Sequence, residues 1–143
     1  MEDNRVKDIL AANGFKFKKQ FGQNFITDAN LLSSIVEGAG VDKNSTVVEI
    51  GCGAGTLTRA IAARAKKVVA FEIDRDLKPV LAVTLGGADN AEVVFRDFMR
   101  VNMSEFEGEM PPYLVIANLP YYITTPLVMR FIEEAKKCLS LTV

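Results

Sequence analysis

Glu49-Ile50-Gly51-Cys52-Gly53-Ala54-Gly55-Thr56 is the stretch of this sequence that decides the fold. It follows the strand-like run 46–50 and opens the segment 56–65, in which Leu57 and Ile61 recur at helical spacing. Glycines between a strand and a helix let the backbone turn tightly and let a ligand approach main-chain amides at the helix N-terminus. The stretch therefore predicts a strand–turn–helix unit that holds a cofactor.

Strand-like and helix-like patterns alternate along the chain from about residue 28 onward. Short, almost continuous apolar runs separated by helical segments are typical of a parallel sheet with helices on both faces. We therefore predict an α/β, Rossmann-like domain. The expected strands are 46–50, 67–73, 92–95, 113–117 and 139–143, the last cut short, and the expected helices begin near Asp28, Thr56, Asp74 and Thr125.

Two prolines constrain the expected helices. Pro79 fits the helix after Asp74 only within its first turn, because proline lacks the N–H that later turns require. Pro126 is expected at the first position of the last helix, where that missing N–H does no harm. The buried face of this helix is expected to comprise Leu127, Val128, Phe131 and Ile132.

The length and composition of the chain exclude several classes of protein and of active site. The chain has 143 residues, a net charge of −1 and no histidine, which predicts one globular domain and excludes His-dependent nucleophilic catalysis and His-ligated metals. Cys52 and Cys138 lie far apart without metal-ligand spacing, so we expect free thiols and no metal. No apolar run reaches the roughly 18 residues of a membrane span, and no signal peptide is evident. A cytoplasmic protein is the expectation.

The N-terminal segment 1–27 differs in pattern from the βα region 28–143. A short helix with Val6, Ile9 and Leu10 on one face is expected to end at Gly14. Beyond it, Lys16, Lys18 and Lys19 alternate with Phe15, Phe17 and Phe21. Such a basic-aromatic segment can meet phosphates and bases together. A solvated loop with its phenylalanines in the core is the alternative that we leave open.

Acidic residues follow two further strands. Glu72 comes about twenty residues after the glycines, a position from which a carboxylate can accept hydrogen bonds from both ribose hydroxyls of a nucleoside cofactor. Asp74 is expected to cap a helix instead. Asp97 can accept from an adenine amine, and Phe98 can offer that ring an apolar face. Either acid alone could be an ordinary cap, but both stand at strand ends, where α/β sheets bind ligands.

The tetrapeptide Asn118-Leu119-Pro120-Tyr121 follows the strand 113–117. It offers an amide side chain, a backbone carbonyl that the proline turn is expected to leave free, and an aromatic ring. This set can hold a flat amine such as the exocyclic amine of a nucleobase. A turn in which proline merely ends the strand is the alternative.

The glycine spacing separates two classes of cofactor. The dinucleotide pattern G-x-G-x-x-G would need glycine at Thr56. Glycines at 51, 53 and 55 after an acid instead resemble the first motif of S-adenosylmethionine-dependent methyltransferases. A nicotinamide-dependent dehydrogenase is therefore disfavoured.

With these motifs together, the chain resembles the ribosomal RNA adenine dimethyltransferase family over essentially its whole length. The motifs that carry the resemblance are Lys19-Gln20-Phe21-Gly22-Gln23-Asn24-Phe25, Val48-Glu49-Ile50-Gly51, Phe71-Glu72-Ile73-Asp74, Arg96-Asp97 and Asn118-Leu119-Pro120-Tyr121. The resemblance implies an S-adenosylmethionine-dependent enzyme that methylates two adjacent adenosines in a hairpin near the 3′ end of small-subunit ribosomal RNA. Its expected partner is that RNA, within a pre-30S-type particle, and no membrane.

The resemblance also assigns residues. It implies cofactor contacts from Asn24, Ile26, Gly51, Glu72, Asp97 and Asn118, to which Gly53, Ile73 and Phe98 are added from their places beside these. Asn118 and the Pro120 carbonyl would orient the target amine, and Tyr121 would stack on a base swung out of the RNA.

Two departures from the family accompany the resemblance. Cys52 stands where many members carry proline, and we expect a small buried packing residue rather than a nucleophile. Members also continue into further strands and a helical C-terminal RNA-binding domain, so this chain reads as a partial domain that stops after the fourth or fifth strand. Methylation of large-subunit RNA and a non-catalytic ribosome-assembly or RNA-binding role stay open, and the oligomeric state is not predicted.

Overall fold

The structure is a computed structural model that describes Asp8, Ala12 and residues 28–143. The predicted N-terminal helix, the basic-aromatic segment and the predicted cofactor residues Asn24 and Ile26 lie outside this described part. None of the helices within it is long and apolar enough to cross a membrane.

Five parallel strands form one sheet in the order β3-β2-β1-β4-β5. β1 in the centre pairs with β2 on one side and with β4 on the other, in continuous register. The predicted Rossmann-like α/β fold is thereby confirmed. The strands are β1 (Thr46–Ile50), β2 (Lys67–Phe71), β3 (Ala91–Val94), β4 (Tyr113–Ala117) and β5 (Cys138–Thr142).

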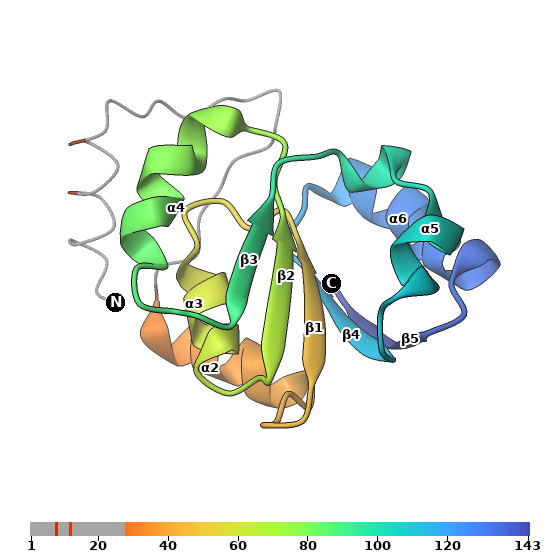
Figure 1. Cartoon of the computed structure of the whole chain (residues 1–143), viewed down its shortest axis with the longest axis horizontal. Coiled ribbons are helices and arrows are strands. Elements are labelled where there is room, and N and C mark those ends of the chain that lie inside the picture. The colour runs from red at the N-terminus through yellow and green to blue at the C-terminus, as the bar shows by residue number, and fades with distance from the viewer. Residues whose placement is uncertain (1–7, 9–11, 13–27) are drawn as a thin grey trace.

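Helices cover both faces of the sheet, as Figure 1 shows, with α2, α3 and α4 on one side and α5 and α6 on the other. The α-helices are α2 (Ala29–Gly38), α3 (Thr56–Ala62), α4 (Lys78–Thr84), α5 (Met103–Gly108) and α6 (Tyr121–Glu134), and two short 3₁₀ turns are η2 (Arg75–Leu77) and η3 (Phe98–Arg100).

Alternation along the central strands builds a core on each face. Val48 and Val69 point towards α5 and α6, while Val47 and Val68 point towards the opposite helices. All five residues of β1 are buried, which is the pattern of a strand covered on both sides. This rigid centre fixes the loops that leave its carboxyl ends.

Helix α6 begins earlier than the sequence predicts. It starts at Tyr121 with Pro120 as its N-cap, so Pro126 lies in the second turn rather than at the first position. Proline there lacks the N–H of a regular helix, so this turn of α6 has one intrahelical hydrogen bond fewer. Leu127 and Phe131 are buried as expected, but Ile132 is 70% exposed, so the predicted buried face was too wide.

Two elements between β3 and β4 were not predicted. The turn η3 follows Asp97, whose carboxylate accepts from the Met99 N–H at 3.0 Å. Helix α5 is short, and its buried Glu107 accepts hydrogen bonds from the Tyr113 hydroxyl at 2.6 Å and from the Lys137 N–H at 3.0 Å. A polar residue that anchors a helix in this way breaks the apolar period that sequence reading relies on.

The helix after β2 is also divided. Asp74 caps the turn η2, as its carboxylate accepts from the Asp76 N–H at 3.0 Å, and α4 begins only at Lys78. Pro79 lies in the first turn of α4, as predicted. Strand β2 ends at Phe71, so Glu72 stands just beyond the sheet.

Candidate functional site

The candidate site lies at the carboxyl ends of the strands. The chain leaves β1 towards β2 on one side and later returns to β4 on the other, and ligands of open α/β sheets bind at such a reversal of strand order. A cavity of about 900 Å³, including its open mouth, occupies this position. It is bordered by all the described residues predicted to contact a cofactor: Gly51, Gly53, Glu72, Ile73, Asp97, Phe98 and Asn118.

The glycine loop packs directly on the tetrapeptide after β4. Gly51 has φ +80°, which L side chains rarely adopt, and a Cβ there would lie 2.7 Å from Leu119 Cδ2 and 3.3 Å from the Asn118 carbonyl oxygen. Glycine is therefore required both by the backbone conformation and by the space. The two motifs that the sequence separates by more than sixty residues form adjoining walls of the cavity.

Glu72 fixes the loop from the neighbouring strand. Its side chain is 7% exposed, and its two oxygens accept from the N–H groups of Gly53 at 2.9 Å, Ile73 at 3.0 Å and Asp74 at 2.9 Å. Burial raises the pKa of Glu72, while these amides oppose the rise. A carboxylate offers about four acceptor positions. Bonds to both ribose hydroxyls, as predicted, would thus need one main-chain bond to give way.

Glu49 is a second buried carboxyl that the site prediction did not include. It is 1% exposed at the end of β1, borders the cavity and accepts a hydrogen bond from the Thr58 hydroxyl. Burial raises its pKa to about 7, with a further rise from the charge of Glu72 and a partial offset from the Thr58 bond. The sequence feature that could have marked Glu49 as a site residue is its position at the strand end before the glycine loop. Its burial could not be read from the sequence, because it depends on packing between strand and helix.

Asp97 and Phe98 line the cavity from the turn η3. Asp97 is exposed, and its Oδ2 lies 3.8 Å from Arg100 Nε. The Phe98 ring is only 2% exposed because it stacks on Phe131 at 5.4 Å and meets Phe71 edge-on at 4.9 Å. Phe98 thus packs in the core and also borders the cavity, and the apolar face predicted for it stays a prediction.

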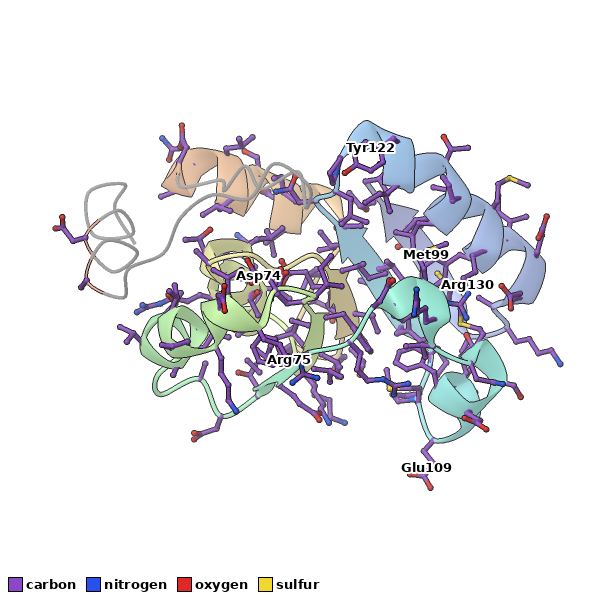
Figure 2. The ribbon with its side chains drawn as sticks, turned by 90° about the horizontal axis from the view of Figure 1, so that it is seen from above. Asp74, Arg75, Met99, Glu109, Tyr122 and Arg130 are labelled. Carbon is purple, nitrogen blue, oxygen red and sulfur yellow. The ribbon has the colours of Figure 1, made fainter. Side chains whose placement is uncertain are left out.

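Arg130 ties this turn to helix α6, which sequence reasoning missed. Its guanidinium donates to the carbonyl oxygens of Phe98 and Val101, and its Nε donates to Glu134 at 3.1 Å. The guanidinium also lies over the Phe98 ring, 5.6 Å from the centroid. Figure 2 shows Arg130 beside Met99, the middle residue of η3. No sequence motif marks this contact because its partners are backbone carbonyls.

The tetrapeptide Asn118-Leu119-Pro120-Tyr121 differs from its prediction at one backbone carbonyl. Asn118 is exposed at the cavity and Pro120 borders it, as expected. The Pro120 carbonyl, however, is not free, since it accepts from the Ile123 N–H at 3.0 Å and from the Thr124 hydroxyl at 3.2 Å. The prediction overlooked the helix that begins immediately after the proline. Tyr121 is the first residue of that helix, and its predicted stacking role stays a prediction.

Cys52 is a packing residue, as predicted. It is 6% exposed and packs with Ala70 and Leu77, and burial holds the pKa of its thiol well above the usual range. Both cysteines are free thiols. Among the residues that the structure describes, no cluster of three or more acidic or cysteine side chains is arranged to hold a metal ion.

Comparison with known proteins places these features in a family. Residues 14–142 match the model of the ribosomal RNA adenine dimethylase family. The chain is 47% identical over 134 residues to Ribosomal RNA small subunit methyltransferase A of Geobacillus thermodenitrificans, covering 91% of this chain and 46% of the relative. The protein of the same name from Streptococcus gordonii is 51% identical over 133 residues, covering 90% and 46%.

Solved structures give the same result. The 23S rRNA methyltransferase ErmE aligns with a TM-score of 0.70 and 34% identity, covering 80% of this chain and 45% of that one. A dimethyladenosine transferase from Plasmodium falciparum aligns with a TM-score of 0.65 and 28% identity, covering 78% and 39%. The chain thus spans about half the length of the curated relatives it matches. On the match of its family model, which extends over most of its length, the chain belongs to the ribosomal RNA adenine dimethylase family.

Proposed function

We propose that this chain carries the catalytic site of an S-adenosylmethionine-dependent methyltransferase that dimethylates the exocyclic amines of two adjacent adenosines near the 3′ end of small-subunit ribosomal RNA. The observation that carries the proposal is the position of Asn118, which is exposed at the same cavity that the glycine loop and Glu72 border. Relatives that are 47% and 51% identical to this chain over 134 and 133 aligned residues are named small-subunit ribosomal RNA methyltransferases, which supports this substrate.

The cavity fits the proposed cofactor. Gly51 and Gly53 border it with main chain alone, and Glu72 and Asp97 place carboxylates along its wall. When bound, S-adenosylmethionine would supply an electrophilic methyl group. Gly51, Gly53, Glu72, Ile73, Asp97 and Phe98, with Asn24 and Ile26 from outside the described residues, are the residues we propose to hold it.

The chain's own task is then to orient a weak nucleophile. The lone pair of an adenine amine is delocalised into the ring, and a hydrogen bond from that amine to the Asn118 side-chain oxygen would favour a more tetrahedral nitrogen. This is positioning and electrostatic stabilisation, and it requires no histidine. Pro120 could contribute its carbonyl only if the amine displaced the Thr124 hydroxyl. We propose Tyr121 as the stacking residue.

Substitution of Asn118 by alanine tests the proposal. Methyl transfer should fall by roughly 10²–10³-fold, the usual effect of removing one positioned donor or acceptor. Affinity for S-adenosylhomocysteine, measured by calorimetry, should change little. Thr124→Ser keeps a hydroxyl next to the site and serves as the matched control. Methylation by Asn118→Ala at the wild-type rate would remove the proposed role.

Large-subunit ribosomal RNA is the second candidate substrate, and its supporting observation is the similarity to the 23S enzyme ErmE. Methylation of small-subunit against large-subunit RNA fragments by the same preparation distinguishes the two. Cofactor binding without methylation of either RNA would favour a non-catalytic role in ribosome assembly. We propose a cytoplasmic pre-30S-type particle as the setting.

A further inference from the structure

A second hollow adjoins the candidate cofactor cavity. It is lined by Arg75, Arg96, Arg100, Asp97, Ile73 and Phe95. Three of these residues, Ile73, Arg96 and Asp97, also border the cofactor cavity. The hollow therefore opens at the end of the cavity formed by η3, on the side away from Asn118. Figure 2 labels Arg75, which stands next to Asp74 at this end of the sheet.

The hollow concentrates positive charge. Three guanidinium groups share it with one carboxylate, whereas the whole chain has a net charge of −1. The single carboxylate is a weak competitor, because Asp97 and Arg100 are 3.8 Å apart with side chains that are 47% and 88% exposed. An ion pair this exposed stabilises the protein little and can be exchanged for a phosphate at small cost.

Arg75 is held in place by a hydrogen bond, and apolar side chains also line the hollow. Arg75 Nη2 donates to the Phe95 carbonyl oxygen at 3.3 Å, which leaves its other N–H groups available. Ile73 is 43% exposed and Phe95 is half-buried beside it. Guanidinium groups next to an aromatic and an aliphatic side chain suit a single strand of nucleic acid, since phosphates pair with arginine and bases stack on flat apolar surface.

We propose that the arginine hollow formed by Arg75, Arg96 and Arg100 binds phosphates of the substrate RNA strand across the cofactor cavity from the target adenosine. The proposal rests on the proposed function, because it assigns the second contact of the same RNA. A strand held here while its target base lies at Asn118 would cross the mouth of the cofactor cavity, and its binding would position the base.

The test measures how RNA affinity depends on salt. A fluorescent single-stranded oligoribonucleotide with two adjacent adenosines is titrated with the wild-type chain, the double variant Arg75→Ala/Arg100→Ala, and the single variant Arg100→Ala, which leaves the Arg75–Phe95 bond intact. Arg96 is left unchanged because it also borders the cofactor cavity. Arg64→Ala is the matched control, since Arg64 is exposed between α3 and β2, at the opposite end of the strands.

Each lost phosphate contact should lower the slope of log affinity against log salt by about 0.7 for a single strand. We expect this loss in Arg100→Ala, a larger loss in the double variant, the wild-type slope in Arg64→Ala, and unchanged affinity for S-adenosylhomocysteine in all of them. A wild-type slope in the double variant, an equal loss in Arg64→Ala, or no RNA binding by the wild type at low salt would overturn the proposal.

Methylation of the same oligoribonucleotide separates this proposal from the proposed function. RNA binding that depends on the arginines without any methyl transfer would leave the hollow standing and remove the proposed function. Methyl transfer at the same rate in the wild type and in the arginine variants would keep the proposed function and remove the proposed role of the hollow.

Discussion

The two walls of the cavity are built differently. The cofactor wall, made of Glu49, the glycine loop and Glu72, is buried, and its carboxyl groups are hydrogen-bonded within the chain. The wall that we propose for the substrate (the substrate wall), made of Asn118, Leu119 and Pro120 just before α6, has its amide side chain exposed. One wall is thus fixed before any ligand arrives, and the other keeps its key polar group in solvent.

This difference predicts which substitutions change the stability of the fold and which change the rate of methyl transfer. A buried carboxyl that becomes charged costs free energy of folding, whereas an exposed amide costs almost none. Substitutions of the buried carboxyls in the cofactor wall should therefore change the free energy of unfolding, and substitution of the exposed Asn118 in the substrate wall should change turnover alone.

The largest effect on stability is expected at Glu49 and should depend on pH. With its pKa at about 7 in the folded chain against 4.5 for the ordinary side chain, the folded state holds a proton that the unfolded state has lost between these values. Wild-type stability contributed by this group is therefore present below pH 4.5 and falls as the pH rises to 7. The stability lost through this group over that pH range is about 3 kcal/mol.

Glu49→Gln removes the titration and keeps an acceptor for Thr58. Relative to the wild type, its free energy of unfolding in urea should rise by about 3 kcal/mol between pH 4.5 and pH 8. Glu92→Gln is the control, because Glu92 forms an exposed ion pair with Lys67 at 3.7 Å and should matter little at any pH. A constant difference between Glu49→Gln and wild type across this range would show that the cofactor wall is less desolvated than its burial indicates.

A smaller effect is expected where α6, the helix that follows the substrate wall, meets the turn η3. Arg130 reaches from α6 to two carbonyls of the turn that carries Asp97. Arg130→Met keeps the apolar stem and removes the donors, which should cost about 2 kcal/mol, the range for hydrogen bonds to a charged group. Because the turn borders the cavity, affinity for S-adenosylhomocysteine should fall as well.

Glu134→Gln provides the comparison for Arg130. Glu134 is half exposed and contacts only the outer side of the guanidinium, at Nε. This variant should lose less than about 0.5 kcal/mol and keep the wild-type affinity. Equal losses in Arg130→Met and Glu134→Gln would mean that the surface ion pair, rather than the bonds to the turn, accounts for the contribution of Arg130 to stability.

The contrast between the walls also explains what could be predicted from the sequence. Gly51, Glu72 and Asp97 follow strand ends, and a parallel sheet brings such positions to one edge whatever the side-chain detail. Arg130 and Glu107 act on backbone groups from distant elements, so no local pattern marks them. The Pro120 carbonyl was misjudged because its occupancy depends on where α6 begins, and helix boundaries are the least certain part of any sequence-based prediction.

The smallest effect on stability is expected at Asn118, and it gives the sharpest form of the comparison. The side chain is exposed, and the atom of this residue that limits the space at Gly51 is its backbone oxygen, which alanine preserves. Asn118→Ala should therefore change the free energy of unfolding by less than about 0.5 kcal/mol, as measured in urea, while it removes most methyl transfer. If the variant lost as much stability as Arg130→Met, Asn118 would be part of the folded scaffold, and the distinction between a fixed cofactor wall and an exposed substrate wall would fail.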